Sequence, residues 1–412
     1  MNKIELLAPA GNMEKLKMAF VYGADAVYIG GERFGLRAFA GNFNIDEIKE
    51  AVEYAHNIGK KVYVTVNIFP HNEDLIGLDT YLLELQNVSV DAILVADPGV
   101  FQIAKETIPD MELHLSTQAN NTNYKSAEFW FNQGIKRIVL ARELNFEEIK
   151  TITEKSPQGL EFEAFMHGAM CMSYSGRCLL SNYMVGRDAN RGQCAHPCRY
   201  KYYLVEEKRP GEYMPVEEDE RGTYIFNSKD LCMIEHIPQL VESGITSFKI
   251  EGRMKSAYYV ATVVRAYRMA IDSYLQNPAT YKFDPVWMDE LNKASHREFS
   301  KGFYHGKPDA NGQIYHTSAY VRDYAFIGLV LDYDSETGIA TIEQRNKMIL
   351  GDKIEIIGPK TAMFKQTIEH MWNDLGEPIE SAPHPQQVIK MRVNQPVEKY
   401  GILRREHKDG EQ

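Results

Sequence analysis

Cysteine is missing from residues 1–170 and from residues 233–412, so all five cysteines of this 412-residue chain fall between Cys171 and Cys232. Long apolar runs are missing too, because no stretch reaches the roughly 18 apolar residues of a membrane span. The N-terminus, MNKIELLAPAGN, lacks the apolar run and small-residue cleavage site of a secretory signal. We therefore expect a cytoplasmic protein with no membrane association. Thiols stay reduced in that compartment, so clustered cysteines indicate metal or redox chemistry rather than disulfides.

Basic residues are fewer than acidic ones, 46 against 57, and the net charge is −11. Nucleic-acid binders usually carry a basic face instead. The segment from Cys171 to Tyr203 departs from this average, because it has a single acid, Asp188, and a net charge of +4. Its basic residues are Arg177, Arg187, Arg191, Arg199 and Lys201. This stretch is either a solvated loop or a site for phosphate or carboxylate groups, which arginine side chains bind well.

The chain before Asn277 alternates short apolar runs with amphipathic helical patterns. In NIDEIKEAVEYAHNIG, for example, Asn44 and Glu47 form a capping-box pattern and Gly59 ends the helix. Eight runs predict strands, and a long helix follows Ser256. This count favours an α/β fold of the (β/α)8 type, a TIM-like barrel, over the alternative of an open doubly wound sheet. The predicted strands are 5–8, 26–30, 61–67, 92–96, 112–116, 137–141, 161–166 and 247–251.

The domain boundaries are predicted from the places where the alternation of strands and helices stops. The barrel is predicted to span residues 1–277, with a long insertion after strand seven, residues 168–246, that holds every cysteine. Residues 278–309 read as a helical linker. Short β runs with turns then predict a small β-barrel domain over residues 310–406. That domain would either be structural or dimer-forming, or it would grip an RNA or another macromolecule.

Polar residues follow the ends of several predicted strands. Loops at the carboxyl ends of barrel strands build the active site in this fold, so these side chains should face one mouth. They are Asn67, Asp97, Gln118, Arg142, His167 and Glu251. Each could instead make only structural hydrogen bonds. The stretches STQAN and KIEGR are the more suggestive ends, and we expect one pocket lined by His167, Gln118, Glu251 and Arg253 that suits a small carboxylate metabolite.

The cysteine spacing is C-x6-C-x15-C-x3-C-x33-C. It matches neither the paired C-x2-C knuckles of a zinc ribbon nor the compact ferredoxin run. Four thiolates that converge in space could still hold an iron–sulfur cluster or zinc. The alternative is a set of buried structural thiols, since free cysteine is often buried.

Three long motifs resemble peptidase family U32, the collagenase-like proteins. They are ELLAPAGNMEKLKMAFVYGADAVYIGG, FMHGAMCMSYSGRCLLSNYMVGRDANRGQCAHPCRY and FKIEGRMKSAYYVATVVRAYR, and the resemblance covers almost the whole chain. Within that family, GRDANRGQCAHPCR together with a C-terminal β-domain is most similar to the bacterial tRNA hydroxylases. Other members hydroxylate ribosomal RNA or take part in ubiquinone hydroxylation.

The resemblance implies oxygen-independent hydroxylation of the tRNA wobble uridine to 5-hydroxyuridine, with prephenate as the needed metabolite. It also implies a [4Fe–4S] cluster as cofactor that four cysteines hold without Cys198, although the C-x3-C spacing alone does not decide whether Cys198 replaces Cys194 as a ligand. The implied ligands are Cys171, Cys178, Cys194 and Cys232. The other site residues are expected from their places in the chain and not from the resemblance. As strand-end residues, His167, Glu251 and Arg253 are the expected catalytic residues. Substrate would be bound by the strand-end amides and the arginines of the insertion, Gln118, Asn67, Arg177, Arg187 and Arg191.

Two other functions stay open at this point. The family name suggests a protease, but the chain has no H-E-x-x-H zinc helix and no G-x-S-x-G elbow. A Cys–His protease built on Cys171 and His167 is conceivable. The chain could also be the cluster-bearing partner of a related second subunit, or it could form a homo-oligomer.

Overall fold

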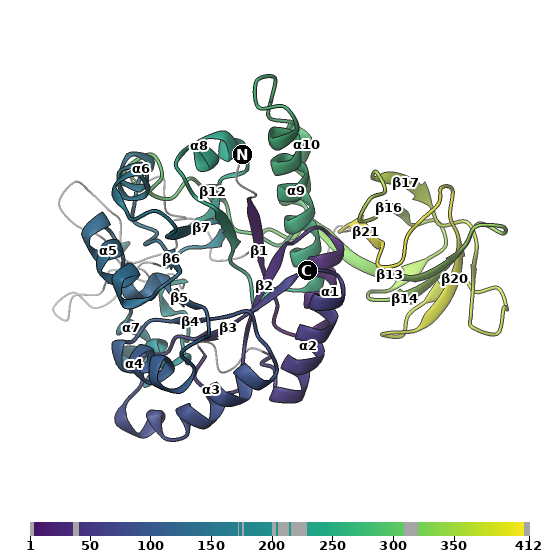
Figure 1. Cartoon of the computed structure of the whole chain (residues 1–412). Helices are drawn as coiled ribbons and strands as arrows, with labels where there is room; N and C mark the ends of the chain where they lie inside the picture. Colours follow the sequence, from purple (N-terminus) through teal and green to yellow (C-terminus); the bar gives the residue numbers. More distant parts are fainter. Residues whose placement is uncertain are drawn as a thin grey trace.

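The computed structural model describes residues 4–35, 41–171, 173–174, 177–199, 203–204, 214–215, 229–308 and 320–407. Its larger part is a closed barrel of eight parallel strands, in the order β11-β1-β2-β3-β4-β5-β6-β7 with β7 pairing back to β11 (Figure 1). The predicted fold class is confirmed. The barrel strands are β1 (Glu5–Pro9), β2 (Ala26–Gly30), β3 (Lys61–Val66), β4 (Ala92–Val95), β5 (Leu113–Leu115), β6 (Arg137–Val139), β7 (Glu161–Ala169) and β11 (Ser247–Ile250).

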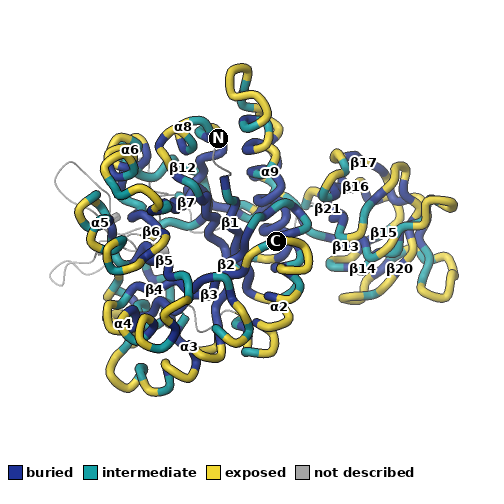
Figure 2. Tube along the Cα trace, in the orientation of Figure 1, coloured by how far each residue is buried: buried dark blue, intermediate teal, exposed yellow. Residues whose placement is uncertain are grey.

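Helices cover the outside of the barrel, one after each strand. Their apolar faces pack on the strands, and their outer faces are exposed (Figure 2). They are α1 (Met13–Val21), α2 (Ile45–Asn57), α3 (Leu78–Asn87), α4 (Pro98–Thr107), α5 (Tyr124–Gln133), α6 (Phe146–Lys155), α8 (Ile237–Glu242) and α9 (Ala257–Gln276). Among the described residues, no helix has the length and apolar character needed to cross a bilayer.

The cysteine-bearing insertion departs from the βα rhythm. It contributes α7 (Leu180–Val185), the short pair β8 (Tyr203–Leu204) and β9 (Met214–Pro215), and β10 (Asp230–Cys232). Strand β10 runs antiparallel to β7 and places Cys232 opposite His167. The stretch predicted as a helical linker is helical only in α10 (Pro285–Asn292), because β12 (Phe299–Ser300) then joins the sheet beside β10.

The C-terminal domain is an antiparallel β-domain with its own apolar core. Its main sheet has the order β17-β16-β21-β13-β14-β20-β18, and β15 pairs with β19. Among the described residues β17 does not pair with β18, so the sheet is a half-barrel rather than a closed one. The strands are β13 (Tyr324–Asp334), β14 (Ile339–Gln344), β15 (Met348–Ile349), β16 (Lys353–Ile357), β17 (Phe364–Thr367), β18 (Met371–Trp372), β19 (Ser381–Ala382), β20 (Val388–Arg392) and β21 (Ile402–Glu406).

The two parts of the molecule are joined by buried polar contacts. The Tyr22 hydroxyl on the edge of α1 donates to the Tyr400 carbonyl at 2.9 Å. Arg404 of β21 is fully buried and pairs with Glu290 of α10 at 2.6 Å and Glu355 of β16 at 2.9 Å. The C-terminal domain is thus held beside α9 and α10 (Figure 1). It lies next to the loop that joins β11 to α9.

Candidate active site

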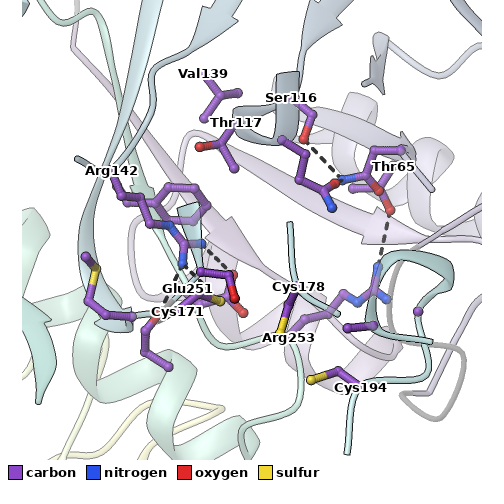
Figure 3. A pocket seen from close by; sticks show the side chains of 18 of the residues that line it. Thr65, Ser116, Thr117, Val139, Arg142, Cys171, Cys178, Cys194, Glu251 and Arg253 are labelled. Carbon is purple, nitrogen blue, oxygen red and sulfur yellow. Dashed lines mark hydrogen bonds and ion pairs between the residues drawn. The ribbon is translucent and has the colours of Figure 1, made fainter. Parts of the chain in front are cut away.

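A cavity of about 300 Å³ lies at the carboxyl ends of the barrel strands. Side chains that follow five strands line it, and the cysteine-bearing segment closes its other side. In Figure 3, Cys171, Cys178 and Cys194 lie along one wall, opposite Ser116, Thr117 and Val139. The polar residues that line it, within the strands or just after them, include Thr65, Asn67, Ser116, Gln118, Arg142, Lys249, Glu251 and Arg253.

Arg253 is enclosed in this wall and only 3% exposed. Its Nη1 donates to the Thr65 hydroxyl at 3.2 Å (Figure 3). Gly30 makes room for the guanidinium, since a Cβ there would lie 2.1 Å from Nη1. Glycine is therefore required at Gly30, the end of β2, because any larger residue would collide with the Arg253 side chain.

Glu251 and Arg142 form the second charged part of the wall. Their closest atoms, Glu251 Oε2 and Arg142 Nη2, are 3.9 Å apart. The Tyr28 hydroxyl donates to the same carboxylate at 3.5 Å. Arg142 also lies over the Phe165 ring at 3.9 Å and directs Nη1 toward Cys171 Sγ at 3.9 Å. This arginine links the carboxylate of one strand end to the first cysteine of the insertion.

An amide pair forms the polar side of the cavity. Asn67 Nδ2 donates to Gln118 Oε1 at 3.0 Å and to the Ser116 hydroxyl at 3.2 Å. Asn67 Oδ1 is buried and accepts no hydrogen bond from the described residues. Buried polar atoms are nearly always paired in native proteins. An unpaired acceptor on a cavity wall is therefore a position where a ligand N–H or O–H would bind well.

Lys249 is a pocket residue that the sequence reasoning did not single out. It is 4% exposed, pairs with the buried Glu163 at 2.7 Å, and lies between the rings of Tyr28 and Phe165. A lysine in the middle of a buried strand, FKIEG, is the signal that could have found it, because lysine is almost never fully buried unless it is paired.

His167 and Asp97 lie outside the cavity lining. His167 is 2% exposed, and its Nδ1 is 3.3 Å from the Tyr267 hydroxyl. Burial lowers the pKa of His167 to about 3, with smaller effects from the charges of His296 and Lys255. The ring is therefore neutral at pH 7. Asp97 caps α4 by accepting from the amides of Gly99 and Val100.

The cysteines divide into a group of four and one apart. Cys171, Cys178, Cys194 and Cys198 all line the cavity. Cys232 is fully buried on β10, where its sulfur accepts from the Tyr267 hydroxyl at 3.7 Å. Burial raises the pKa of the Cys232 thiol. The structure thus brings together three of the four cysteines that the resemblance implied as ligands, and adds Cys198.

The donor chemistry of this group suits an iron–sulfur cluster, because four thiols face a shared cavity. Asn190 holds the loop around Cys178, accepting from its N–H and donating to its carbonyl, both at 3.1 Å. The His196 amide donates to Cys194 Sγ at 3.3 Å. Within the described part of the chain, however, no three such side chains already surround one point closely enough to hold a single ion.

The arginines of the insertion mostly bind the protein itself. Arg177 donates to the Gln118 carbonyl at 2.8 Å and lies over the Phe69 ring. Arg191 pairs with Asp74 at 2.6 Å and Glu73 at 3.3 Å. Arg187 lines the cavity and donates to the Gln193 carbonyl at 3.1 Å. The Arg199 side chain and Lys201 lie outside the described residues. Arg177 and Arg191 therefore fasten the insertion over the barrel mouth.

Relatives of known name cover the chain from end to end. A Bacillus subtilis protein named tRNA hydroxylation protein P1 is 44% identical, over 98% of this chain and 95% of its own length. The Escherichia coli tRNA hydroxylation protein P is 37% identical, over 98% of this chain and 97% of its own. A Porphyromonas gingivalis protein named collagenase is 33% identical, over 98% of this chain and 99% of its own.

Two family profiles match successive parts of the chain. The profile of peptidase family U32 matches residues 11–314 and thus spans the barrel and the cavity. The profile of the peptidase family U32 C-terminal domain matches residues 322–404, the half-barrel. With both profiles matched and relatives similar over almost its full length, the chain belongs to peptidase family U32.

Proposed function

We propose that this chain modifies RNA, hydroxylating C5 of the tRNA wobble uridine to give 5-hydroxyuridine without dioxygen. One observation carries the proposal. Four cysteines face the polar strand ends in a single cavity, in a chain that is similar over 98% of its length to proteins named for tRNA hydroxylation.

The cavity has features that suit an extruded uracil base. An enzyme that acts on a base must take it out of its stack and read its hydrogen-bonding edge. The unpaired acceptor Asn67 Oδ1 would receive the imide N–H of uracil, and Gln118 lies beside it. At about 300 Å³ the cavity is at the small end of ligand pockets, as expected for a base or a small metabolite rather than for a longer polymer.

The cationic wall suits a small carboxylate, and prephenate is the metabolite that the family resemblance suggests. Lys249 is neutralised by Glu163, and Arg142 lies near Glu251. Arg253 has a hydroxyl partner, Thr65, on this wall. A guanidinium forms strong paired hydrogen bonds with carboxylates in such a partly dry setting. We assign Arg253 to the metabolite because its guanidinium is enclosed in the cavity wall. Glu251 is the carboxylate near Arg142.

A [4Fe–4S] cluster would be held by Cys171, Cys178 and Cys194, with Cys198 as the fourth ligand in place of Cys232. Cys198 lines the cavity, whereas Cys232 does not and is fully buried on β10, where its sulfur accepts from the Tyr267 hydroxyl. When bound, the cluster supplies electron transfer beside the base. The protein's part is to position the thiols, which Asn190 and the His196 amide support.

A peptidase is the second candidate, favoured by the relative named collagenase. The Cys171–His167 pair expected for a thiol protease is not formed, because His167 bonds to Tyr267 and does not line the cavity. Neither a zinc helix nor a serine elbow is present in the sequence. The geometry therefore supports RNA modification better.

Metal content separates the two candidates directly. We expect protein purified without oxygen to be brown and to carry about four irons and four sulfides per chain, the content of one cubane cluster. A peptidase of this kind would need no iron. Stoichiometric zinc, or no metal, in anaerobically purified protein would contradict the proposal.

A further inference from the structure

A second and wider cavity, of about 470 Å³, lies between the barrel and the C-terminal domain. One side is formed by the loop that joins β11 to α9, and the other by the first residues of the C-terminal domain. Its size is within the range of about 300 to 1,000 Å³ that is usual for ligand pockets. The described lining includes Lys255, Tyr258, Ser295, Tyr320, Arg322 and Phe326.

This chamber opens beside the candidate active site. The two cavities share four lining residues, namely Ala169, His196, Glu251 and Met254. Met254 is 49% exposed although it stands at both cavities. The two cavities therefore adjoin, and a chain molecule with one unit in the first cavity could place its next unit in the second.

Aromatic rings and cations dominate the chamber. Tyr258 and Phe326 stack across the domain junction, with centroids 5.7 Å apart and planes at 12°. Lys255 Nζ lies 3.8 Å from the centre of the Tyr320 ring. Arg322 is exposed, and no ion pair joins it to a described carboxylate. Acids are present at two places: Glu251 in the shared wall, and Glu355 and Glu406 behind the Tyr324 hydroxyl.

Single-stranded RNA is the ligand class that this combination favours. Proteins bind unpaired nucleotides by stacking bases on aromatic side chains and by neutralising phosphates with lysine and arginine. A free metabolite would leave most of the 470 Å³ chamber unfilled, and a peptide would gain little from the exposed cations.

We propose that the chamber between the domains binds the nucleotide next to the target base, with Tyr320 as the stacking surface and Arg322 as the phosphate contact. This inference rests on the proposed RNA modification and adds a role for the C-terminal domain. The half-barrel supplies one wall of the RNA site, so the barrel alone has an incomplete site.

The test is tRNA binding measured by fluorescence anisotropy at two salt concentrations, with unmodified tRNA transcript as the probe. Base stacking on an aromatic ring is worth about 1–3 kcal/mol, so Tyr320→Ala should weaken binding by about tenfold, whereas Tyr320→Phe should bind as the wild type does. Arg322→Ala should weaken binding less and reduce the slope of log affinity against log salt by about one. Arg392→Ala, at an exposed arginine on β20 of the same domain, is the matched control.

The outcomes separate this inference from the proposed function. If the wild type binds no tRNA and forms no 5-hydroxyuridine, the proposed function fails. If the wild type binds and modifies tRNA while Tyr320→Ala and Arg322→Ala bind no worse than Arg392→Ala, only the chamber assignment is overturned. The chamber assignment would also be overturned if Tyr320→Ala and Arg322→Ala lost binding to free uridine monophosphate but kept the tRNA affinity of the wild type. The chamber would then be a small-molecule site. Unchanged iron content and melting temperature confirm that the variants are folded.

Discussion

At the scale of single residues, the chemistry of the site depends on which sulfurs can reach one another. Cys198 and Cys232 are both near the cysteine loop in sequence, yet only Cys198 lines the cavity. The Cys232 sulfur is instead fully buried on β10, where it accepts from the Tyr267 hydroxyl.

We therefore expect Cys198→Ala to lose the absorbance and iron of the cluster, as should Cys171→Ala, Cys178→Ala and Cys194→Ala. Cys232→Ala should keep its iron. Its free energy of unfolding should fall by only about 1–2 kcal/mol, the contribution of one small buried group and one weak hydrogen bond. Iron analysis of anaerobic protein and denaturant unfolding measure both effects. The reverse pattern, with iron lost in Cys232→Ala and kept in Cys198→Ala, would restore the ligand set implied by the family resemblance.

His167 gives the fold a dependence on pH. Its pKa is lowered to about 3 by burial, whereas an unfolded histidine titrates near 6.5. The unfolded chain therefore takes up a proton below pH 6.5 that the folded chain does not. The resulting stability is complete above pH 6.5 and is lost as the pH falls toward 3.

Between pH 7.5 and 5.5 this one residue should lower the free energy of unfolding by about 1.4 kcal/mol. His167→Gln keeps a neutral polar side chain near the Tyr267 hydroxyl and should lack that part of the pH dependence. Urea unfolding of both proteins at the two pH values measures the difference. Equal pH dependence in the two would mean that His167 is protonated or exposed in the folded protein.

At the scale of elements, the regular part of the barrel could be predicted and the insertion could not. Helix α2 begins at its capping box and ends before Gly59, as its 3.6-residue pattern indicates, because local preference and burial agree there. Strand β2 begins and ends where its apolar run does. The strand ends then fix Asn67, Gln118, Glu251 and Arg253 around one mouth.

The insertion lacks such a pattern. Its pairing with a barrel strand, β10 against β7, has three residues, and all three of β10 are buried. With no alternation of buried and exposed positions, the sequence does not indicate which way Cys232 faces. The ion pair of Arg191 with Asp74 joins residues that are 117 positions apart, so no local sequence pattern predicts it. For that reason the sequence does not indicate that Arg191 holds the insertion, whereas its role in substrate binding stays a prediction.

The loop around Cys178 depends on Asn190, whose amide closes two hydrogen bonds with the Cys178 backbone. Asn190→Ala removes both, each worth about 1 kcal/mol, and should let the second ligand move. We expect a clear fall in iron per chain after aerobic handling, while Asn182→Ala, an exposed residue on α7, keeps its iron. Equal cluster lifetimes in the two variants would show that Asn190 does not position Cys178.

At the scale of the whole molecule, the half-barrel is fastened to the barrel by a buried charge cluster. Arg404 lies between Glu290 and Glu355 and is fully buried. Although burial alone would raise it, the partners Lys293 and Arg404 hold the pKa of Glu355 at about 2. Removing one member of a buried pair leaves the other charge uncompensated.

Arg404→Ala should therefore lower the free energy of unfolding by about 3–5 kcal/mol and loosen the chamber between the domains. Arg392→Ala, exposed in the same domain, should change it by less than about 0.5 kcal/mol. Denaturant unfolding followed by tryptophan fluorescence gives both values. A loss below about 1 kcal/mol for Arg404→Ala would mean that the domains are held together by apolar packing alone.

The central claim is that the cavity at the barrel mouth hydroxylates tRNA, and mass spectrometry of tRNA nucleosides tests it most directly. The chain and its Arg253→Ala variant are each produced in a bacterial strain that lacks its own wobble-uridine hydroxylation. Arg253 is enclosed in the cavity wall at 3% exposure, so its loss removes the group that we propose binds the carboxylate but none of the cysteines. We predict 5-hydroxyuridine with the wild type and none with Arg253→Ala, at equal protein level and equal iron content. No 5-hydroxyuridine with the iron-loaded wild type, or undiminished 5-hydroxyuridine with Arg253→Ala, would contradict the account.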